Sequence, residues 1–169
     1  MKTQDYILSI LVDDEPGVLS RIAGLFSGRG FNINSLSVAN TAEPDVSRIT
    51  MVTCCDAQII EQIKKQLHKL INVITVTDLT EKKYVQRQLA LIKVNARSEK
   101  KAEILRIVDI FRCRIVDVGQ SHYIIEVSGD ADKHNAIVDL LQPMGIIEIA
   151  STGAIALARD NGKAKSNKK

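Results

Sequence analysis

Apolar and polar residues alternate along the chain in a way that predicts a strand, a helix and two further strands in its first part. Residues 6–12 form a near-continuous apolar run, which is typical of a central strand. Residues 17–29 carry apolar side chains at spacings of three and four, which predicts an amphipathic helix. Residues 31–38 and 48–54 then alternate as half-buried strands do, and they predict a hairpin.

A second helix is predicted directly after Asp56, whose side chain can cap it, and a fourth strand covers residues 73–79. The resulting order is β-α-β-β-α-β. This is the ferredoxin-like plan, in which two helices cover one face of a four-stranded antiparallel sheet. The other face of such a sheet needs a cover, so we expect dimerisation or an extension of the sheet.

The same order of elements repeats in the second half of the chain. Its predicted elements are a strand at 88–94, a helix at 98–112, a hairpin at 114–118 and 123–127, a helix at 130–141 and a strand at 146–150 that can continue to Leu157. We therefore predict an α+β protein of two tandem ferredoxin-like βαββαβ domains. The predicted divisions are a first domain at 1–80, a second at 81–159 and a disordered basic tail at 160–169.

The two copies differ at the turn before the first helix. Pro16 and Gly17 have no counterpart in the second copy, where residues 97–100 read Arg-Ser-Glu-Lys. The segment 31–33, Phe-Asn-Ile, corresponds to Val-Asp-Val at 116–118. If this chain binds a ligand, we therefore expect the site in the first copy.

The turn of the first copy has the chemistry that a small amino acid requires. The first amides of a helix lack partners within it, so a carboxylate can sit on those near Val18 and Leu19. Asp14 can take the ammonium group, or it can cap the helix instead. Asn32 and Asn34 would share one strand face and offer donors and acceptors. A purely structural Pro-Gly turn with strand asparagines is the alternative.

Charge and hydropathy argue against nucleic acid and membrane as binding partners. The formal net charge is +3, but residues 159–169 hold five of the cations and one acid, so the rest is close to neutral. A folded nucleic-acid binder normally has a basic face, and none is visible. No apolar stretch approaches the length of a membrane span. These features predict a cytoplasmic protein that binds neither nucleic acid nor membrane.

No constellation of residues predicts catalysis or a metal site. The three cysteines, Cys54, Cys55 and Cys113, lack paired spacing and are expected to be buried thiols. The three histidines are too widely spaced for metal ligands on one element. A Ser-His-Asp or Cys-His arrangement is not evident. We therefore expect a chain without catalytic residues, metal or cofactor of its own, which favours a sensor over an enzyme.

The first copy resembles a known family of regulatory domains. The pattern Asp14-x-Pro16-Gly17-x-Leu19, followed by Phe31-Asn32-Ile33, resembles the ACT domain, an amino-acid-sensing module. The runs at 17–27, 29–36 and 47–50 resemble the regulatory small subunit of acetolactate synthase. This second resemblance covers roughly residues 5–160.

The resemblance implies a non-catalytic regulatory subunit in branched-chain amino acid biosynthesis. Such a subunit binds and activates a large catalytic subunit, a transferase that carries thiamine diphosphate, FAD and Mg²⁺ and condenses two 2-ketoacids. It also confers feedback inhibition by valine, which lies at the interface of two paired N-terminal ACT domains, so a homodimer is implied. The implied effector contacts are Asp14, Gly17, Val18, Leu19, Asn32 and Ile33.

The resemblance leaves alternatives for the effector and for the function. Relatives often have Asn at the position of Asp14, which leaves the choice among valine, leucine and isoleucine undecided. An ACT-type sensor that acts on a different partner protein is the alternative function. An RNA-binding ferredoxin-like module would need exposed aromatic residues on its strands, and the predicted strands carry Ile, Val, Thr and Ser instead.

Overall fold

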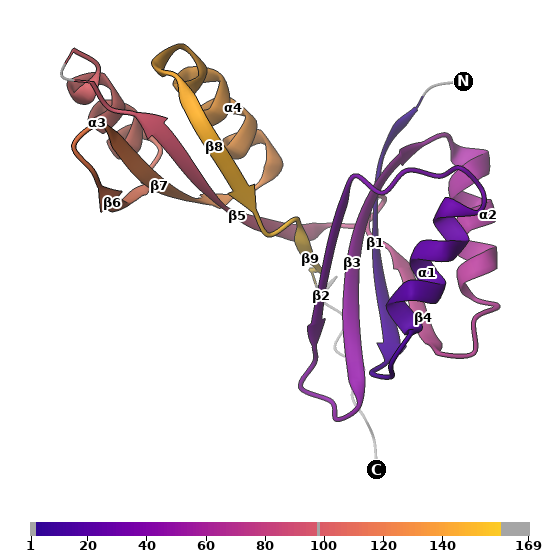
Figure 1. The fold of residues 1–169 in the computed structure, drawn as a ribbon. Coiled ribbons are helices and arrows are strands. Elements are labelled where there is room, and N and C mark those ends of the chain that lie inside the picture. The colour runs from indigo at the N-terminus through magenta and orange to yellow at the C-terminus, as the bar shows by residue number, and fades with distance from the viewer. Residues whose placement is uncertain (1–2, 98, 160–169) are drawn as a thin grey trace. The chain divides into compact units, whose positions relative to one another are not determined.

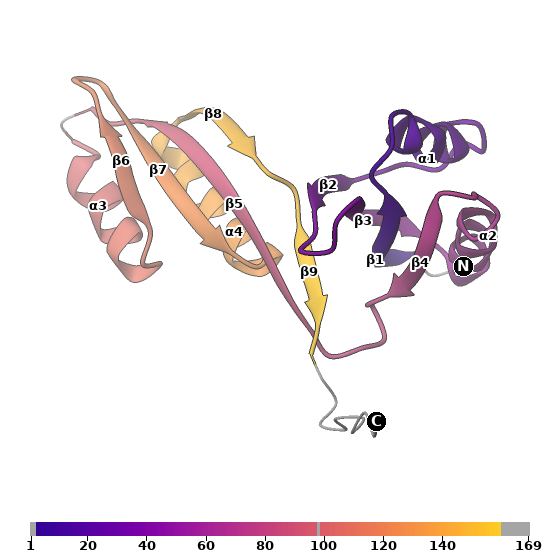
Figure 2. The same ribbon diagram turned by 90° about the horizontal axis from the view of Figure 1, so that it is seen from below.

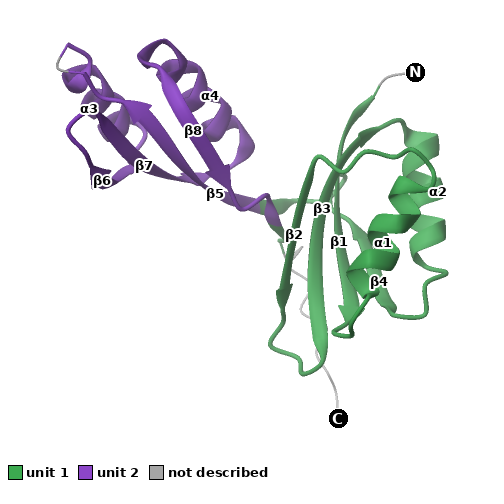
Figure 3. Cartoon of the chain, in the orientation of Figure 1, with its two compact units in different colours: residues 1–85, 156–169 green, residues 86–155 purple. Residues whose placement is uncertain are grey.

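The computed structural model describes residues 3–97 and 99–159, which form two compact units (Figure 3). The first unit comprises the described part of 1–85 together with 156–159, and the second comprises the described part of 86–155. The basic tail predicted for 160–169 lies outside the described residues.

The first unit has the predicted βαββαβ order. Its strands form one antiparallel sheet in the order β2-β3-β1-β4, and both helices lie on the same side of that sheet (Figures 1 and 2). The α+β ferredoxin-like fold is therefore confirmed for this unit. The elements are β1 (Gln4–Asp13), α1 (Val18–Ser27), β2 (Ser35–Asn40), β3 (Val46–Cys55), α2 (Ala57–Leu67) and β4 (Val73–Asp78).

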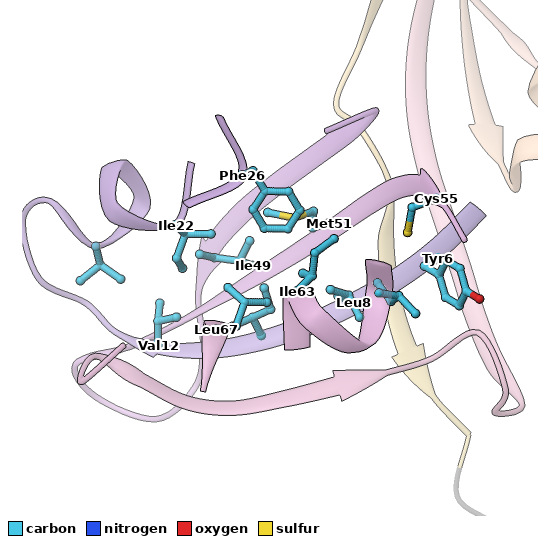
Figure 4. Close-up of a cluster of buried hydrophobic side chains, with 13 residues drawn as sticks. Tyr6, Leu8, Val12, Ile22, Phe26, Ile49, Met51, Cys55, Ile63 and Leu67 are labelled. Atoms are coloured by element: carbon cyan, nitrogen blue, oxygen red, sulfur yellow. The ribbon is translucent and has the colours of Figure 1, made fainter. Parts of the chain in front are cut away.

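The core of the first unit lies between the sheet and the two helices (Figure 4). Alternate residues of β1 point into it, because successive side chains of a strand face opposite sides. Phe26 of α1 and Ile63 of α2 are fully buried against them. Burying such a side chain stabilises the fold by about 1.5–3 kcal/mol. The fully buried residues here include Leu8, Ile10, Ile22, Phe26, Ile49, Met51, Ile63 and Leu67.

The second unit repeats this plan. Its sheet has the order β6-β7-β5-β8, and a separate core packs α3 and α4 against β5 and β7. Ile92, Ile104, Ile125 and Ile137 are fully buried in that core. The elements are β5 (Tyr84–Asn95), α3 (Lys101–Ile110), β6 (Arg114–Val118), β7 (His122–Gly129), α4 (Ala131–Leu141), a 3₁₀ turn η1 (Gln142–Met144) and β8 (Ile146–Ser151).

The last strand, β9 (Ile155–Ala158), pairs with β5, and its residues from Ala156 on belong to the first unit. The predicted strand at 146–157 is interrupted, because Gly153 takes a left-handed conformation with φ of 78°. Ala156 packs with Ile7 and Leu79 in a small cluster on the sheet face that the helices do not cover. The chain itself therefore covers part of the face for which the sequence predicted a partner.

The second helix of each unit is capped by an aspartate. Asp56 accepts hydrogen bonds from the amides of Gln58 and Ile59, both at 2.9 Å, as the sequence predicted. Asp130 accepts one from the amide of Lys133 at 3.0 Å. These bonds satisfy amides that the helix leaves without partners.

The strand predicted at 31–38 begins four residues late, at Ser35. The Phe31 amide donates to the Phe26 carbonyl at 3.0 Å, and the two rings pack edge to face at 6.3 Å. The Asn32 carbonyl accepts from the Thr53 hydroxyl at 2.6 Å. Asn32 and Asn34 are therefore outside the strand, and the prediction that they share a strand face was wrong.

The predicted cap on α1 was also wrong. The residue at the N-cap is Gly17, and no side chain caps this helix. The Asp14 carboxylate accepts a hydrogen bond from the Ser47 hydroxyl instead, at 3.1 Å. Among the cysteines, Cys55 is buried as expected whereas Cys54 is exposed, because neighbouring strand residues face opposite sides.

Candidate functional site

The turn between β1 and α1, residues Asp14–Gly17, is open on the side where a ligand would approach. Gly17 has φ of 89° and ψ of −8°, a left-handed conformation that residues with a Cβ rarely adopt. A Cβ built on Gly17 would meet nothing within 4 Å. Glycine is therefore required by the backbone conformation rather than by crowding, and the space beside it is open.

The first amides of α1 are available to an anion. The Val18 amide makes only a long contact of 3.4 Å with the Glu15 carbonyl. Within the described residues, the amides of Leu19 and Ser20 donate to no acceptor. The start of a helix carries a partial positive charge of about half a unit, and a small carboxylate on these amides would satisfy them.

Side chains at the turn provide the other features that a zwitterion needs. Asp14 is exposed, and the Ser47 hydroxyl bridges it to the Asn40 side chain at 3.1 and 3.2 Å. This bridge orients the carboxylate through one of its two oxygens. Val18 is buried in the core, but Leu19 is 41% exposed and presents apolar surface beside the open amides.

The other two predicted site residues, Asn32 and Ile33, come shortly before β2, whose first residues lie at the opposite end of the sheet from the Asp14–Gly17 turn (Figure 1). Asn32 is exposed, and its amide donates to the Asn34 side chain at 2.9 Å. Ile33 is half-buried and packs on the edge of the core. The structure thus brings Asp14, Gly17, Val18 and Leu19 together and separates them from Asn32 and Ile33.

The register of the sheet gives the size of this separation. Asp13, just before the turn, pairs with Val46 of β3, whereas the Asn34 amide donates to the carbonyl of Val52. Six residues along a strand span about 20 Å. One small amino acid therefore does not contact both groups within a single chain.

Residues that the sequence did not single out hold the Asp14–Gly17 turn in place. Asn72, in the loop between α2 and β4, is 8% exposed and donates to the Glu15 carboxylate at 2.9 Å. Ser47, at the start of β3, holds Asp14. These contacts join residues 33 to 57 positions apart, and no local pattern reports them.

A further feature lies in the second unit. A cavity of about 430 Å³ lies beside α4 and is lined by residues that include Gln88, His134 and Ile149. His134 is buried, its Nε2 lies 3.1 Å from the Gln88 carbonyl, and burial lowers the pKa of its imidazole. The described residues contain no cluster of His, Cys, Asp and Glu that could hold a metal.

Models of known protein families match most of the chain. Residues 8–75 match a family model described as an AHAS small subunit-like ACT domain, and residues 87–160 match one described as the small subunit of acetolactate synthase. The chain belongs to the acetolactate synthase small-subunit family. The ACT-domain match includes all six predicted effector contacts.

Several relatives of this small subunit cover nearly the whole chain. A probable acetolactate synthase small subunit from Archaeoglobus fulgidus is 49% identical over 94% of this chain and 99% of its own. The acetolactate synthase small subunit from Aquifex aeolicus is 47% identical over 94% of this chain and 83% of its own. The recognition of the family from the sequence is therefore confirmed.

A solved structure supports the same conclusion for the fold. The acetolactate synthase small subunit from Thermotoga maritima has a TM-score of 0.83 at 42% identity, and the match covers 94% of this chain and 99% of that one. In the part of this small subunit that the structure describes, no helix has the length and apolar character needed to cross a membrane.

Proposed function

We propose that this chain is the non-catalytic regulatory subunit of an acetolactate synthase. It binds the large catalytic subunit, raises its activity and makes it sensitive to valine, the feedback effector of branched-chain amino acid biosynthesis. Thiamine diphosphate, FAD and Mg²⁺ belong to the large subunit in this proposal. Family membership supports the pairing with a large subunit, and the geometry of the first unit supports the effector site.

The observation that carries the effector proposal is the separation of the two halves of the site. The Asp14–Gly17 turn offers helix amides for a carboxylate, a carboxylate for an ammonium group and Leu19 for an aliphatic side chain. Asn32 and Ile33 complete such a site only if they come from another chain, because they lie about 20 Å away along the sheet.

A two-fold dimer through β2 would bring the halves together. Strand β2 is an edge strand of the described sheet and pairs with β3 on one side, and an edge strand is a template for pairing with another chain. A two-fold axis at this edge aligns the strands antiparallel, so that the first residues of one β2 lie beside the last residues of the other. Asn40 ends β2 and is bridged to Asp14 through Ser47. The partner's Asn32–Asn34 segment would therefore approach the Asp14–Gly17 turn.

A site shared by two chains suits allosteric control. Valine that contacts both chains binds one dimer arrangement better than others and shifts the population toward it. Coupling of this kind is typically worth about 1–3 kcal/mol, which is enough to change the activity of a bound catalytic subunit severalfold or more. Localisation in the cytoplasm accords with this role and is part of the proposal.

The test uses calorimetric titration followed by mixed dimers. We expect the purified chain to bind valine and to bind leucine or isoleucine with different affinity. Gly17→Asp and Asn32→His should each abolish valine binding and valine inhibition of the reconstituted enzyme, whereas activation of the catalytic subunit persists.

Mixing the two variants then tests the shared site directly. In a mixed dimer, one site carries both changes and the other carries neither. Equal mixing with free exchange of chains should therefore restore about one quarter of the wild-type valine sites. If the mixture binds no valine although mixed dimers form, the two halves do not come from different chains. If the wild-type chain binds none of the three amino acids, the effector proposal fails.

A further inference from the structure

The side chain of Asn72 connects the two flanks of the Asp14–Gly17 turn. Its amide nitrogen donates to the Glu15 carboxylate at 2.9 Å and lies 3.4 Å from the Asp13 carboxylate. Its amide oxygen accepts from the Arg21 guanidinium of α1 at 2.6 Å. One buried amide therefore ties the end of β1, the turn and the first part of α1 to the loop before β4.

The second unit contains the same backbone arrangement without this side chain. The Asp13 amide donates to the Asn72 carbonyl at 2.9 Å, and the Asn95 amide donates to the Gly145 carbonyl at the same distance. In both units, the pairing with the neighbouring edge strand shifts register just before this point. Gly145 therefore occupies the position of Asn72, and the fold forms there with no side chain.

The two units distinguish a contact that the fold requires from contacts that are specific to the turn of the first unit. The backbone bond occurs in both units, so it belongs to the fold. The second unit ties its turn to the loop before β8 in another way, through the Lys100 ammonium on the Pro143 carbonyl at 2.8 Å. Bonds from one side-chain amide to both flanks of the turn occur, within the described residues, only in the unit whose turn has the open helix start and the left-handed Gly17. A contact that accompanies the turn, and that the fold does not need, is a candidate for organising the turn.

We propose that Asn72 is a positioning residue for the effector site. This inference rests on the proposed function, because it assigns the orientation of a turn that binds valine. Asn72 holds the turn against α1 before the ligand arrives, so that the free amides of α1 and the Asp14 carboxylate face one point. Preorganisation of this kind strengthens binding because less conformational freedom is lost when the ligand binds.

The polarity of the amide makes the proposal specific. Asn72 accepts from a cation with its oxygen and donates to acidic groups with its nitrogen. An aspartate has the same shape but is an acceptor on both sides when ionised. Asn72→Asp therefore keeps the bond to Arg21 and replaces the bond to Glu15 with repulsion between two carboxylates, to which the more distant Asp13 adds a smaller contribution.

The experiment compares Asn72→Asp with the same change combined with Glu15→Gln. We expect the single change to weaken valine binding about tenfold in calorimetry, the effect of losing one charge-assisted hydrogen bond. The added Glu15→Gln supplies an amide donor to the new carboxylate and should bring the affinity back to within about threefold of wild type. A role in packing alone predicts no such recovery.

Two further measurements keep the result interpretable. Arg21→Gln changes an exposed residue and weakens the same connection from the helix side, so it should reduce valine affinity by about threefold even if Asn72→Asp folds poorly. Asn95→Ala, at the position of the second unit that matches Asp13, should leave valine affinity unchanged. Hydrogen exchange at the amides of residues 14–21 in the ligand-free chain should accelerate in Asn72→Asp and recover in the combination.

The outcomes distinguish this inference from the proposal on which it rests. If wild-type chain binds valine and Asn72→Asp binds it equally well, Asn72 does not position the turn, and the effector site stands. If both Asn72→Asp and Arg21→Gln lower affinity but Glu15→Gln restores nothing, the positioning role is also overturned. If wild-type chain binds no effector, both proposals fail together.

Discussion

The two units of this small subunit show which parts of a repeated fold are needed to form it. Both have the order βαββαβ, an isoleucine-rich core and an aspartate that caps the second helix. They differ at the turn before the first helix and at the residue that faces it from the loop before the last strand. The shared features are those of the fold, and the differing features are candidates for function.

The two turns differ in backbone conformation as well as in sequence. In the first unit, α1 begins at a left-handed Gly17 with open amides beside it. In the second unit, α3 begins at Lys100, which has ordinary right-handed angles. The Lys100 ammonium donates to the Pro143 carbonyl at 2.8 Å and ties that turn to η1. The Lys100 side chain thus makes from the turn the kind of connection to the following loop that Asn72 makes from the loop in the first unit.

The largest expected effect on this comparison comes from Gly17→Asp. A side chain at a left-handed position strains the backbone by about 1 kcal/mol, and a carboxylate at the helix start competes with the ligand for the same amides. We expect a loss of valine affinity of at least about 100-fold, equivalent to about 2.7 kcal/mol. Calorimetry and valine inhibition of the reconstituted enzyme measure it.

The matched control is Gly145→Asp, because Gly145 is also left-handed, with φ of 93°, but lies in the second unit. It should lower the stability of that unit by a similar amount and leave valine binding intact. A comparable loss of valine affinity in both variants would mean that strain in either unit, rather than the chemistry of the turn, governs binding.

The sequence predicted the repeated fold well because its signals are local. The apolar periodicity of α1 and α2 and the Asp56 cap depend on residues within a few positions of each other, and the structure bears them out. The family was also recognisable, because the runs at 17–27, 29–36 and 47–50 that carry the resemblance are each contiguous in the sequence.

The failures have a common cause, which is competition from contacts that are distant in sequence. Asp14 looked like a helix cap, but the Ser47 hydroxyl binds its carboxylate. Asn32 and Asn34 looked like strand residues, but the Thr53 hydroxyl and the Phe26 ring hold that segment off the strand. The network at Asn72 joins the turn to a loop 57 positions from Glu15, and no local pattern in the sequence reveals it.

A smaller effect is expected at the aspartates that the two units share. Asp56→Ala removes two cap bonds and should destabilise the first unit by about 1–2 kcal/mol, whereas Asp130→Ala removes one and should cost the second unit about 1 kcal/mol. Urea titration with hydrogen exchange resolved by unit measures both. Neither change should alter valine affinity, and a marked change in Asp56→Ala would show that α2 takes part in the effector site.

The smallest expected effect is a difference between the two units in how their stability depends on pH. Burial lowers the pKa of His134 below its ordinary value of 6.5, so the unfolded chain takes up a proton there before the folded chain does. The stability of the second unit should therefore fall as pH drops below about 6.5 and level off below the folded pKa.

The groups around His134 set the limits of this effect. Lys133 also lowers its pKa, whereas the Gln88 carbonyl and Asp130 raise it, so burial is only partly offset.

His134→Gln retains a donor for the Gln88 carbonyl and removes the titration. In the wild-type chain, the protection of β5 and β7 amides from hydrogen exchange, corrected for intrinsic rates, should weaken between about pH 7 and 5. In His134→Gln this weakening should be absent. In the first unit, the histidine is the exposed His68, and β1 and β3 should respond to the same pH change equally in both proteins. An unchanged pH response of β5 and β7 would instead trace their acid sensitivity to carboxylates, and the two units would then not differ in this respect.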